Sequence, residues 1–336
     1  MKNGLVMGKY RLGWKPDLPD ARDYKYRAPA RVMAALPPAV DLRSGCGPVL
    51  DQGNLGSCTA NAIGSAHQFE QIKQAATSAF IPSRLFIYYN ERDMEGSINQ
   101  DNGAYIRDGM KSVAQQGVCP ETQWPYDTSR FTVKPGADCY SEALKNQVTS
   151  YWAVQQTLDQ LKGCLAEGYP VVFGFTVYES FESDAVARTG EAPMPGPNES
   201  VLGGHAVKAV GYDDATGRFL IKNSWGTGWG NRGYFTLPYG YLTSSDLSAD
   251  FWTIRLVEVD NVNPNPNPPE PPKPKPWCDW PWLLPAATAF VDGAIGEADK
   301  RRSVNVTPTS QEMIEGGLRG LQAHLQRIQK VQGRQG

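Results

Sequence analysis

Residues 51–62 read DQGNLGSCTANA, and this stretch decides how the rest of the sequence is interpreted. Its first half carries two glycines and favours a turn, while the small and apolar residues after Cys58 favour a helix over residues 59–75. Ser57 is a typical N-cap residue, which places Cys58 in the first turn of that helix. The positive partial charge of a helix N-terminus stabilises a thiolate, so Cys58 is a candidate nucleophile.

A nucleophilic cysteine needs a base beside it, and the sequence contains three histidines. His67 lies in the same predicted helix, about two and a half turns past Cys58, on a rigid element that carries it away. His324 lies close to the C-terminal end. His205 follows two glycines and precedes a predicted strand, a position that suits a ring presented at the edge of a lobe. We therefore predict a thiolate–imidazolium pair between Cys58 and His205.

Two further residues complete this predicted chemistry. Asn223, in the segment KNSWG at 222–226, can accept a hydrogen bond from one nitrogen of His205 and hold its ring. Trp225 can cover that contact and keep water out. Gln52 precedes Cys58 across the glycine-containing turn, and its amide can donate to an oxyanion beside the Cys58 backbone N–H.

The order of the predicted elements indicates the fold class. Helical patterns dominate the first half of the chain, and strand patterns dominate the second half. The further predicted helices span 104–116 and 158–167, and the predicted strands span 171–177, 206–212, 218–222, 233–237 and 251–257. Residues 179–202 are interpreted as a long polar loop. Helices followed by strands indicate an α+β protein with two lobes.

Composition divides the chain into four parts. The predicted parts are an irregular N-terminal arm at 1–38, a catalytic domain at 39–260, a Pro-rich linker at 261–276, and a tail at 277–336 with a possible amphipathic helix. Cys119 and Cys139 flank a loop-like segment. They form either a disulfide or two reduced thiols, and the lack of an export signal favours the thiols.

The overall charge and hydropathy exclude several classes of protein. The net charge is −2 and the chain has no basic stripe, so we expect no nucleic-acid partner. No apolar stretch approaches the roughly 20 residues of a transmembrane helix. The N-terminal apolar run is too short for a signal peptide, which predicts a cytoplasmic protein or one exported without such a leader. We expect neither a metal nor a cofactor.

At these motifs the chain resembles the papain-like cysteine peptidases, in a version similar to bacterial branches of the family. The matching motifs are Gln52 with Cys58, GHAV at 204–207, and IKNSWGTGWG at 221–230, within a resemblance that covers about residues 38–258. The resemblance implies a two-lobed fold with a helical N-terminal lobe, a β-rich C-terminal lobe and a cleft between them. It also implies an endopeptidase that uses Cys58, His205 and Asn223, with Gln52 in the oxyanion hole.

The resemblance further implies which residues meet the substrate. Gly103 and Ala104 would pair with the main chain of an extended peptide. The residues expected around the side-chain pocket, or covering the site, are Tyr105, Ile106, Gly174, Gly203, Gly204, Ala206 and Trp225. The glycines predict a roomy, apolar pocket that accepts large hydrophobic side chains.

Two departures from the family pattern bear on regulation. Leu55 stands where many relatives have a disulfide-bonded cysteine, and the arm at 1–38 is shorter than the usual helical prosegment. We predict that the arm lies across or beside the cleft and restrains access. The alternative is that the arm is only a structural clasp.

Two other functions remain open from the sequence. One is a catalytically silent papain-fold protein that binds peptides. The other is a thiol amidase or acyltransferase that acts on peptidoglycan or other acyl donors, since such enzymes also use a cysteine and a histidine. The complete set of Cys58, His205, Asn223 and Gln52 favours the peptidase.

Overall fold

The structure, a computed structural model, describes residues 10–74 and 79–258. Its central feature is an eight-stranded sheet. The strands follow one another in space as β2 (Lys25–Tyr26), β5 (Val148–Val154), β10 (Ser248–Val257), β6 (Val171–Tyr178), β7 (Val201–Asp213), β8 (Arg218–Lys222) and β9 (Tyr234–Pro238), and β3 (Ala39–Asp41) pairs with β7. The linker and tail predicted at 261–276 and 277–336 lie outside the described residues.

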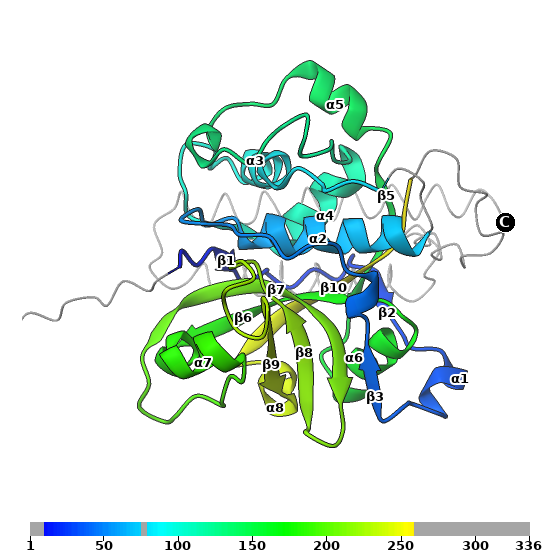
Figure 1. Cartoon of the computed structure of the whole chain (residues 1–336). Helices are drawn as coiled ribbons and strands as arrows, with labels where there is room; N and C mark the ends of the chain where they lie inside the picture. Colours follow the sequence, from blue (N-terminus) through cyan, green and yellow to red (C-terminus); the bar gives the residue numbers. More distant parts are fainter. Residues whose placement is uncertain (1–9, 75–78, 259–336) are drawn as a thin grey trace, which may run out of the picture. The chain divides into compact units, whose positions relative to one another are not determined.

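Helices lie on two sides of the described region (Figure 1). One group comprises α2 (Cys58–Lys73), α3 (Arg84–Met94), α4 (Ile106–Gln115) and α5 (Ala137–Ala143). The other comprises α6 (Leu158–Ala166), α7 (Asp184–Thr189) and α8 (Tyr239–Thr243), beside the strands β6 to β9. This separation agrees with the predicted α+β class.

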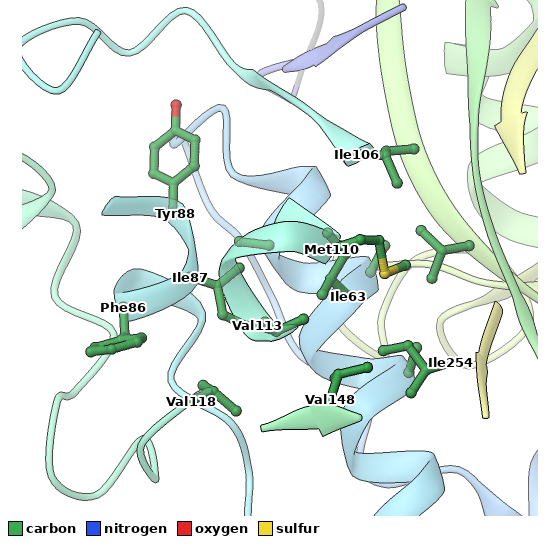
Figure 2. Close-up of a cluster of buried hydrophobic side chains, with 14 of the residues drawn as sticks. Ile63, Phe86, Ile87, Tyr88, Ile106, Met110, Val113, Val118, Val148 and Ile254 are labelled. Atoms are coloured by element: carbon green, nitrogen blue, oxygen red, sulfur yellow. The ribbon is translucent and has the colours of Figure 1, made fainter. Parts of the chain in front are cut away.

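Two hydrophobic cores define the two lobes. Figure 2 shows the first, a cluster to which Ile63 of α2, Ile87 of α3, Met110 of α4 and Ile254 of β10 all belong. The second core is formed mainly by the sheet and includes the aromatic residues Phe173, Phe175, Phe219 and Phe235. Burying these side chains stabilises each lobe, since a fully buried aromatic or aliphatic side chain contributes about 1.5–3 kcal/mol to the free energy of folding.

Helix α2 is buried on nearly all of its faces. It packs against β7 and β10 as well as against α3 and α4. Small residues such as Ala60, Ala62 and Ala66 allow this close approach from every direction. A helix buried all round needs no single apolar face. Its N-terminus is thereby held rigidly between the two cores.

Most predicted elements are confirmed, with shifted ends. The predicted helix at 59–75 begins at Cys58, and the one at 104–116 begins at Ile106, after the two-residue strand β4 (Ala104–Tyr105). The interpretation of 179–202 as a loop is wrong in part, because the segment contains α7, which Ser183 caps by accepting from the Val186 N–H. Helix α3 was missed, although Ser83 accepts from the Phe86 N–H at its start.

The arm is less irregular than expected. Residues Trp14–Lys15 form β1, which pairs in parallel with β4, and β2 joins the edge of the main sheet beside β5. A short helix, α1, spans Ala30–Met33. Cys119 and Cys139 are free thiols, in agreement with the reduced alternative. Within the described residues, no helix has both the length and the hydropathy of a membrane span.

Candidate active site

Cys58 is the first residue of α2 and is completely buried. Ser57 precedes the helix as predicted, but its side chain makes no capping hydrogen bond. Its hydroxyl instead shares a hydrogen bond of 2.5 Å with Tyr126 and accepts from the Asn61 side chain. The start of the helix is therefore fixed by side chains that belong to the helical lobe.

His205 lies in β7 of the other lobe, and Asn223 directly follows the neighbouring strand β8. The Nε2–H of His205 donates to Oδ1 of Asn223 at 2.8 Å, and the backbone N–H of Ser224 donates to the same oxygen. Trp225 stacks on the imidazole, with ring centroids 4.7 Å apart. These contacts hold the proton on Nε2 and leave Nδ1 as the free ring nitrogen, which has no hydrogen-bond partner among the described residues.

The side chain of Gln52 is held at both ends. Its Oε1 accepts from the Ser224 hydroxyl at 2.7 Å, so the amide orientation is set. Its Nε2 donates to the carbonyl of Leu55 and, at 3.0 Å, to the carbonyl of Arg11 in the arm. A peptide carbonyl from elsewhere in the chain thus already lies against this amide.

Burial keeps the thiol and the imidazole neutral. Desolvation raises the pKa of Cys58 to about 12, and the backbone N–H groups of Ala206 and Gly13 oppose this only in part. Desolvation also lowers the pKa of His205 to about 4, against the opposing hydrogen bond to Asn223. In this state neither group carries the charge that an ion pair requires.

The arm provides much of this burial. Tyr10 stacks on the outer face of Trp225, with ring centroids 4.1 Å apart. The carbonyl of Gly13 accepts from the Ala104 N–H at 2.8 Å, and strand β1 continues this pairing. In Figure 1 strand β1 lies between α2 and the strands of the sheet.

Glycines permit the arm to approach so closely. A Cβ at Gly13 would come within 1.9 Å of the Gly56 carbonyl oxygen. A Cβ at Gly103, which has φ +76, would come equally close, at 1.9 Å, to the Gly13 oxygen. Backbone therefore packs against backbone. Gly103, which was predicted to pair with the main chain of a substrate, here faces the main chain of the arm.

Trp14 fills the space beside the expected side-chain pocket. A Cβ at Gly174 or Gly204 would fall within 1.9 or 2.7 Å of its indole ring. The indole N–H donates to Asp250 Oδ2 at 2.9 Å. An indole therefore lies against both glycines, and a carboxylate that no motif predicted lies beside it.

Tyr105, Ile106 and His67 lie in three different surroundings. Lys15 lies over the ring of Tyr105, 4.7 Å from its centroid, while Ile106 is fully buried in the first core. His67 is also buried, and its Nε2 shares a hydrogen bond with the Asn146 carbonyl, which fits its exclusion as the base. Ser224 lies inside the KNSWG segment at 222–226, so its role could have been predicted, whereas nothing in the sequence marks Asp250.

A metal site finds no support in the described ranges. Across residues 10–74 and 79–258, no group of three or more His, Cys, Asp or Glu side chains is arranged to hold a metal ion.

Comparison with known proteins gives a consistent result. The sequence profile of the papain family cysteine proteases matches residues 36–250. An uncharacterized peptidase C1-like protein of Acanthamoeba polyphaga mimivirus is 47% identical over 64% of this chain and 71% of its own length. Thiol protease aleurain of Arabidopsis thaliana is 30% identical over 62% of this chain, which spans only 57% of aleurain. The crystal structure of xylellain, a cysteine protease from Xylella fastidiosa, has a TM-score of 0.69 and 45% identity, covering 76% of this chain and 98% of xylellain.

Proposed function

The chain belongs to the papain family of cysteine proteases, and from that premise we propose that it is an endopeptidase whose nucleophile is Cys58. In this proposal the free Nδ1 of His205 takes the thiol proton, and the thiolate attacks a peptide carbonyl carbon. His205 then donates that proton to the leaving amine. Water hydrolyses the resulting thioester, with His205 acting as the base, and Asn223 holds the imidazole throughout.

Gln52 stabilises the oxyanion in this mechanism. Its Nε2 already donates to a peptide carbonyl, that of Arg11, at 3.0 Å. This contact is the observation that carries the proposal, because it shows that the amide is aimed at a peptide oxygen beside the N-terminus of α2. Its carbonyl contacts are typical of a preorganised donor, which costs no reorganisation during the reaction.

The described state is the latent form of the enzyme. Residues 10–15 occupy the site and bury Cys58, so the thiolate–imidazolium pair forms only after the arm leaves and water and substrate enter. The Gly13 N–H also approaches the sulfur, as its effect on the Cys58 pKa indicates. The arm thereby restrains access directly, which goes beyond the role of a clasp.

An extended substrate takes the place of the arm. Its main chain pairs with Gly103 and Ala104, where Gly13 now lies. One of its side chains enters the pocket between Gly174 and Gly204 that Trp14 now fills. Because Asp250 lies in that pocket, the enzyme accepts large side chains that donate a hydrogen bond. This replaces the purely apolar preference that the glycines alone predicted.

Labelling and proteolysis together test the proposed nucleophile. A thiol-directed epoxide inhibitor should label Cys58 of the full chain under reducing conditions, and casein digestion should require the same residue. Cys58→Ala should lower the rate of digestion by roughly 10⁴- to 10⁶-fold, as expected for loss of a nucleophile. The matched control is Cys46→Ala, which removes a half-buried thiol outside the site and should leave digestion unchanged.

Two results would contradict the endopeptidase. Full labelling of Cys58 without peptide hydrolysis, but with release of cell-wall fragments, would indicate the amidase. Neither labelling nor hydrolysis, even after the arm is displaced, would indicate a silent peptide-binding protein.

A further inference from the structure

Two buried lysines line the same small pocket as Asn223. Lys208 of β7 and Lys222 of β8 face each other across the strand pair and are only 1% and 5% exposed. Among residues 10–74 and 79–258, neither takes part in an ion pair with a carboxylate. Buried charges in proteins are normally paired, so this arrangement lacks a counter-charge.

The ammonium groups are hydrogen-bonded without being neutralised. Lys208 Nζ donates to the Ser65 carbonyl at 2.8 Å, and Lys222 Nζ donates to the Gly47 and Pro48 carbonyls, both at 2.7 Å. Carbonyl dipoles satisfy donors but carry no net charge. Burial lowers the pKa of both lysines, to about 7 for Lys222, where repulsion from Lys208 is the second cause.

A small pocket lies against both lysines. It is bounded by α2, by β7 and β8, and by the segments around Pro48 and Pro82, and a third basic residue, Arg84, also lines it. None of its lining residues is Asp or Glu. About 20 Å³ of it is open to water-sized groups, which exceeds the roughly 10–15 Å³ that one such group needs.

The pocket also offers uncharged donors. Ser65 and Asn223 both line it, and the Ser65 hydroxyl and the Asn223 Nδ2 have no hydrogen-bond partner among the described residues. Asn223 is only 4% exposed, so bulk water does not readily solvate its amide. Buried polar groups without partners are uncommon and indicate a missing acceptor.

We propose that this pocket binds a small inorganic anion, with chloride as the simplest case. A water molecule would satisfy the hydroxyl and the amide but would leave both ammonium groups uncompensated. Arg84 already has a counter-charge in Glu121, with its Nε 2.8 Å from Glu121 Oε2, so the uncompensated charges are those of the two lysines. The nearby acidic groups are Cys46, which acts on both lysines, and Glu70, which acts on Lys208, and neither lines the pocket.

The consequence for catalysis rests on the proposed function. An anion that accepts from Nδ2 of Asn223 would hold the amide with its Oδ1 toward His205. Chloride should therefore raise kcat as well as stability. The stability effect should fade between pH 6 and 9, because loss of the Lys222 proton removes the charge that attracts the anion.

The test is a thermal-unfolding titration of the full chain with sodium chloride, with sodium gluconate holding the ionic strength constant. An anion that binds the native state raises Tm by mass action, and the rise saturates when the site is full. We expect a saturable rise for the wild type and none for Lys222→Met, which keeps the apolar stem and removes the charge. The control is Lys145→Met, an exposed lysine that pairs with Glu142 and should leave the rise intact.

Two results would overturn the anion site: equal Tm values in chloride and gluconate, or an unchanged saturable rise in Lys222→Met. If Lys222→Met does not fold, the chloride-35 NMR linewidth of the wild type decides the matter. Broadening that bromide displaces supports the site, and an unbroadened signal contradicts it. Cys58→Ala should show the same Tm rise as the wild type, so a failure of the proposed peptidase is distinguishable from a failure of the anion site.

Discussion

The catalytic junction, where Cys58 and His205 lie, and the lysine pocket both bury groups whose proposed roles require a charge. Different parts of the chain cover them. At the junction, Cys58 and His205 are covered by the arm at residues 10–15. In the pocket, Lys208 and Lys222 are covered by α2 and by the sheet itself. In the proposed mechanism the first burial ends when the arm leaves, whereas the second lasts as long as the fold does.

This difference indicates that regulation of the catalytic site can act through the arm. The arm is held by backbone contacts at glycines, by one indole and by ion pairs with surrounding residues, so single substitutions can test its docking. The lysines are fixed by two strands of the central sheet, so their charge can be changed by a proton or a bound ion but not by movement of the arm.

The largest effect should come from a single methyl group in the arm. Gly13→Ala places a Cβ within 1.9 Å of the Gly56 oxygen, which docking of the arm cannot accommodate without a backbone shift. We expect casein hydrolysis to rise by about 10-fold or more, since a clash of this kind costs on the order of 1–3 kcal/mol. Initial rates of casein digestion by the full chain measure the effect.

The control for this variant is Gly228→Ala, where a Cβ would meet no atom within 4 Å. It should leave the rate unchanged. If Gly13→Ala lowers Tm without raising the rate, the arm is a clasp and the junction is not reversibly covered.

An intermediate effect should appear in substrate choice once the arm is displaced. Asp250 has φ +60, a conformation that Asn also tolerates, so Asp250→Asn removes the charge and keeps the backbone. In the Gly13→Ala background it should lower the preference for arginine over leucine in this pocket by about 10-fold, because a charged acceptor is lost. A peptide library profiled by kcat/KM measures the change.

The same library contains an internal control. Preference for tryptophan over phenylalanine should change much less, because the Asn side chain still offers an oxygen to an indole N–H. An arginine preference that is absent from the start, or that survives Asp250→Asn, would show that Asp250 does not select the side chain.

The smallest expected effect is a dependence of arm docking on pH. Asp17 of the arm lies beside Asp250 and accepts from the Arg107 backbone N–H. Burial, followed by repulsion from Asp250, raises its pKa to about 7, while the Arg107 charge opposes this. The docked arm thus holds a proton that the free arm releases at an ordinary Asp pKa of about 3.9. This contribution to docking is complete below pH 4 and is lost as the pH rises through 7.

The measurement is the ratio of wild-type to Gly13→Ala activity at each pH, which cancels the titration of the catalytic pair. The ratio should rise several-fold between pH 5 and 8. In Asp17→Asn this ratio should stay flat with pH. The neighbouring ion pair between Arg107 and Asp23 is still formed in that variant. A ratio that falls with rising pH would reverse the assigned sign.

Much of the site could be predicted because its residues lie in short, locally recognisable motifs. Ser57 and the small residues after Cys58 predicted a helix that begins at the nucleophile. The rest depends on contacts between distant segments. Trp14 meets Asp250 across 236 positions of sequence, and no local pattern reports such a pair. Helix α7 was missed because its six residues are too few to show a helical period.

The α+β class and the candidate residues for the chemistry could be predicted from the sequence, because periodicity, capping and residue type are local properties. The burial and charge of these residues could be found only from the folded chain. The arm folds back over Cys58, the imidazole loses its solvent, and two lysines of adjacent strands come to face one pocket. These outcomes depend on burial, which is set by the packing of segments that are distant in the sequence.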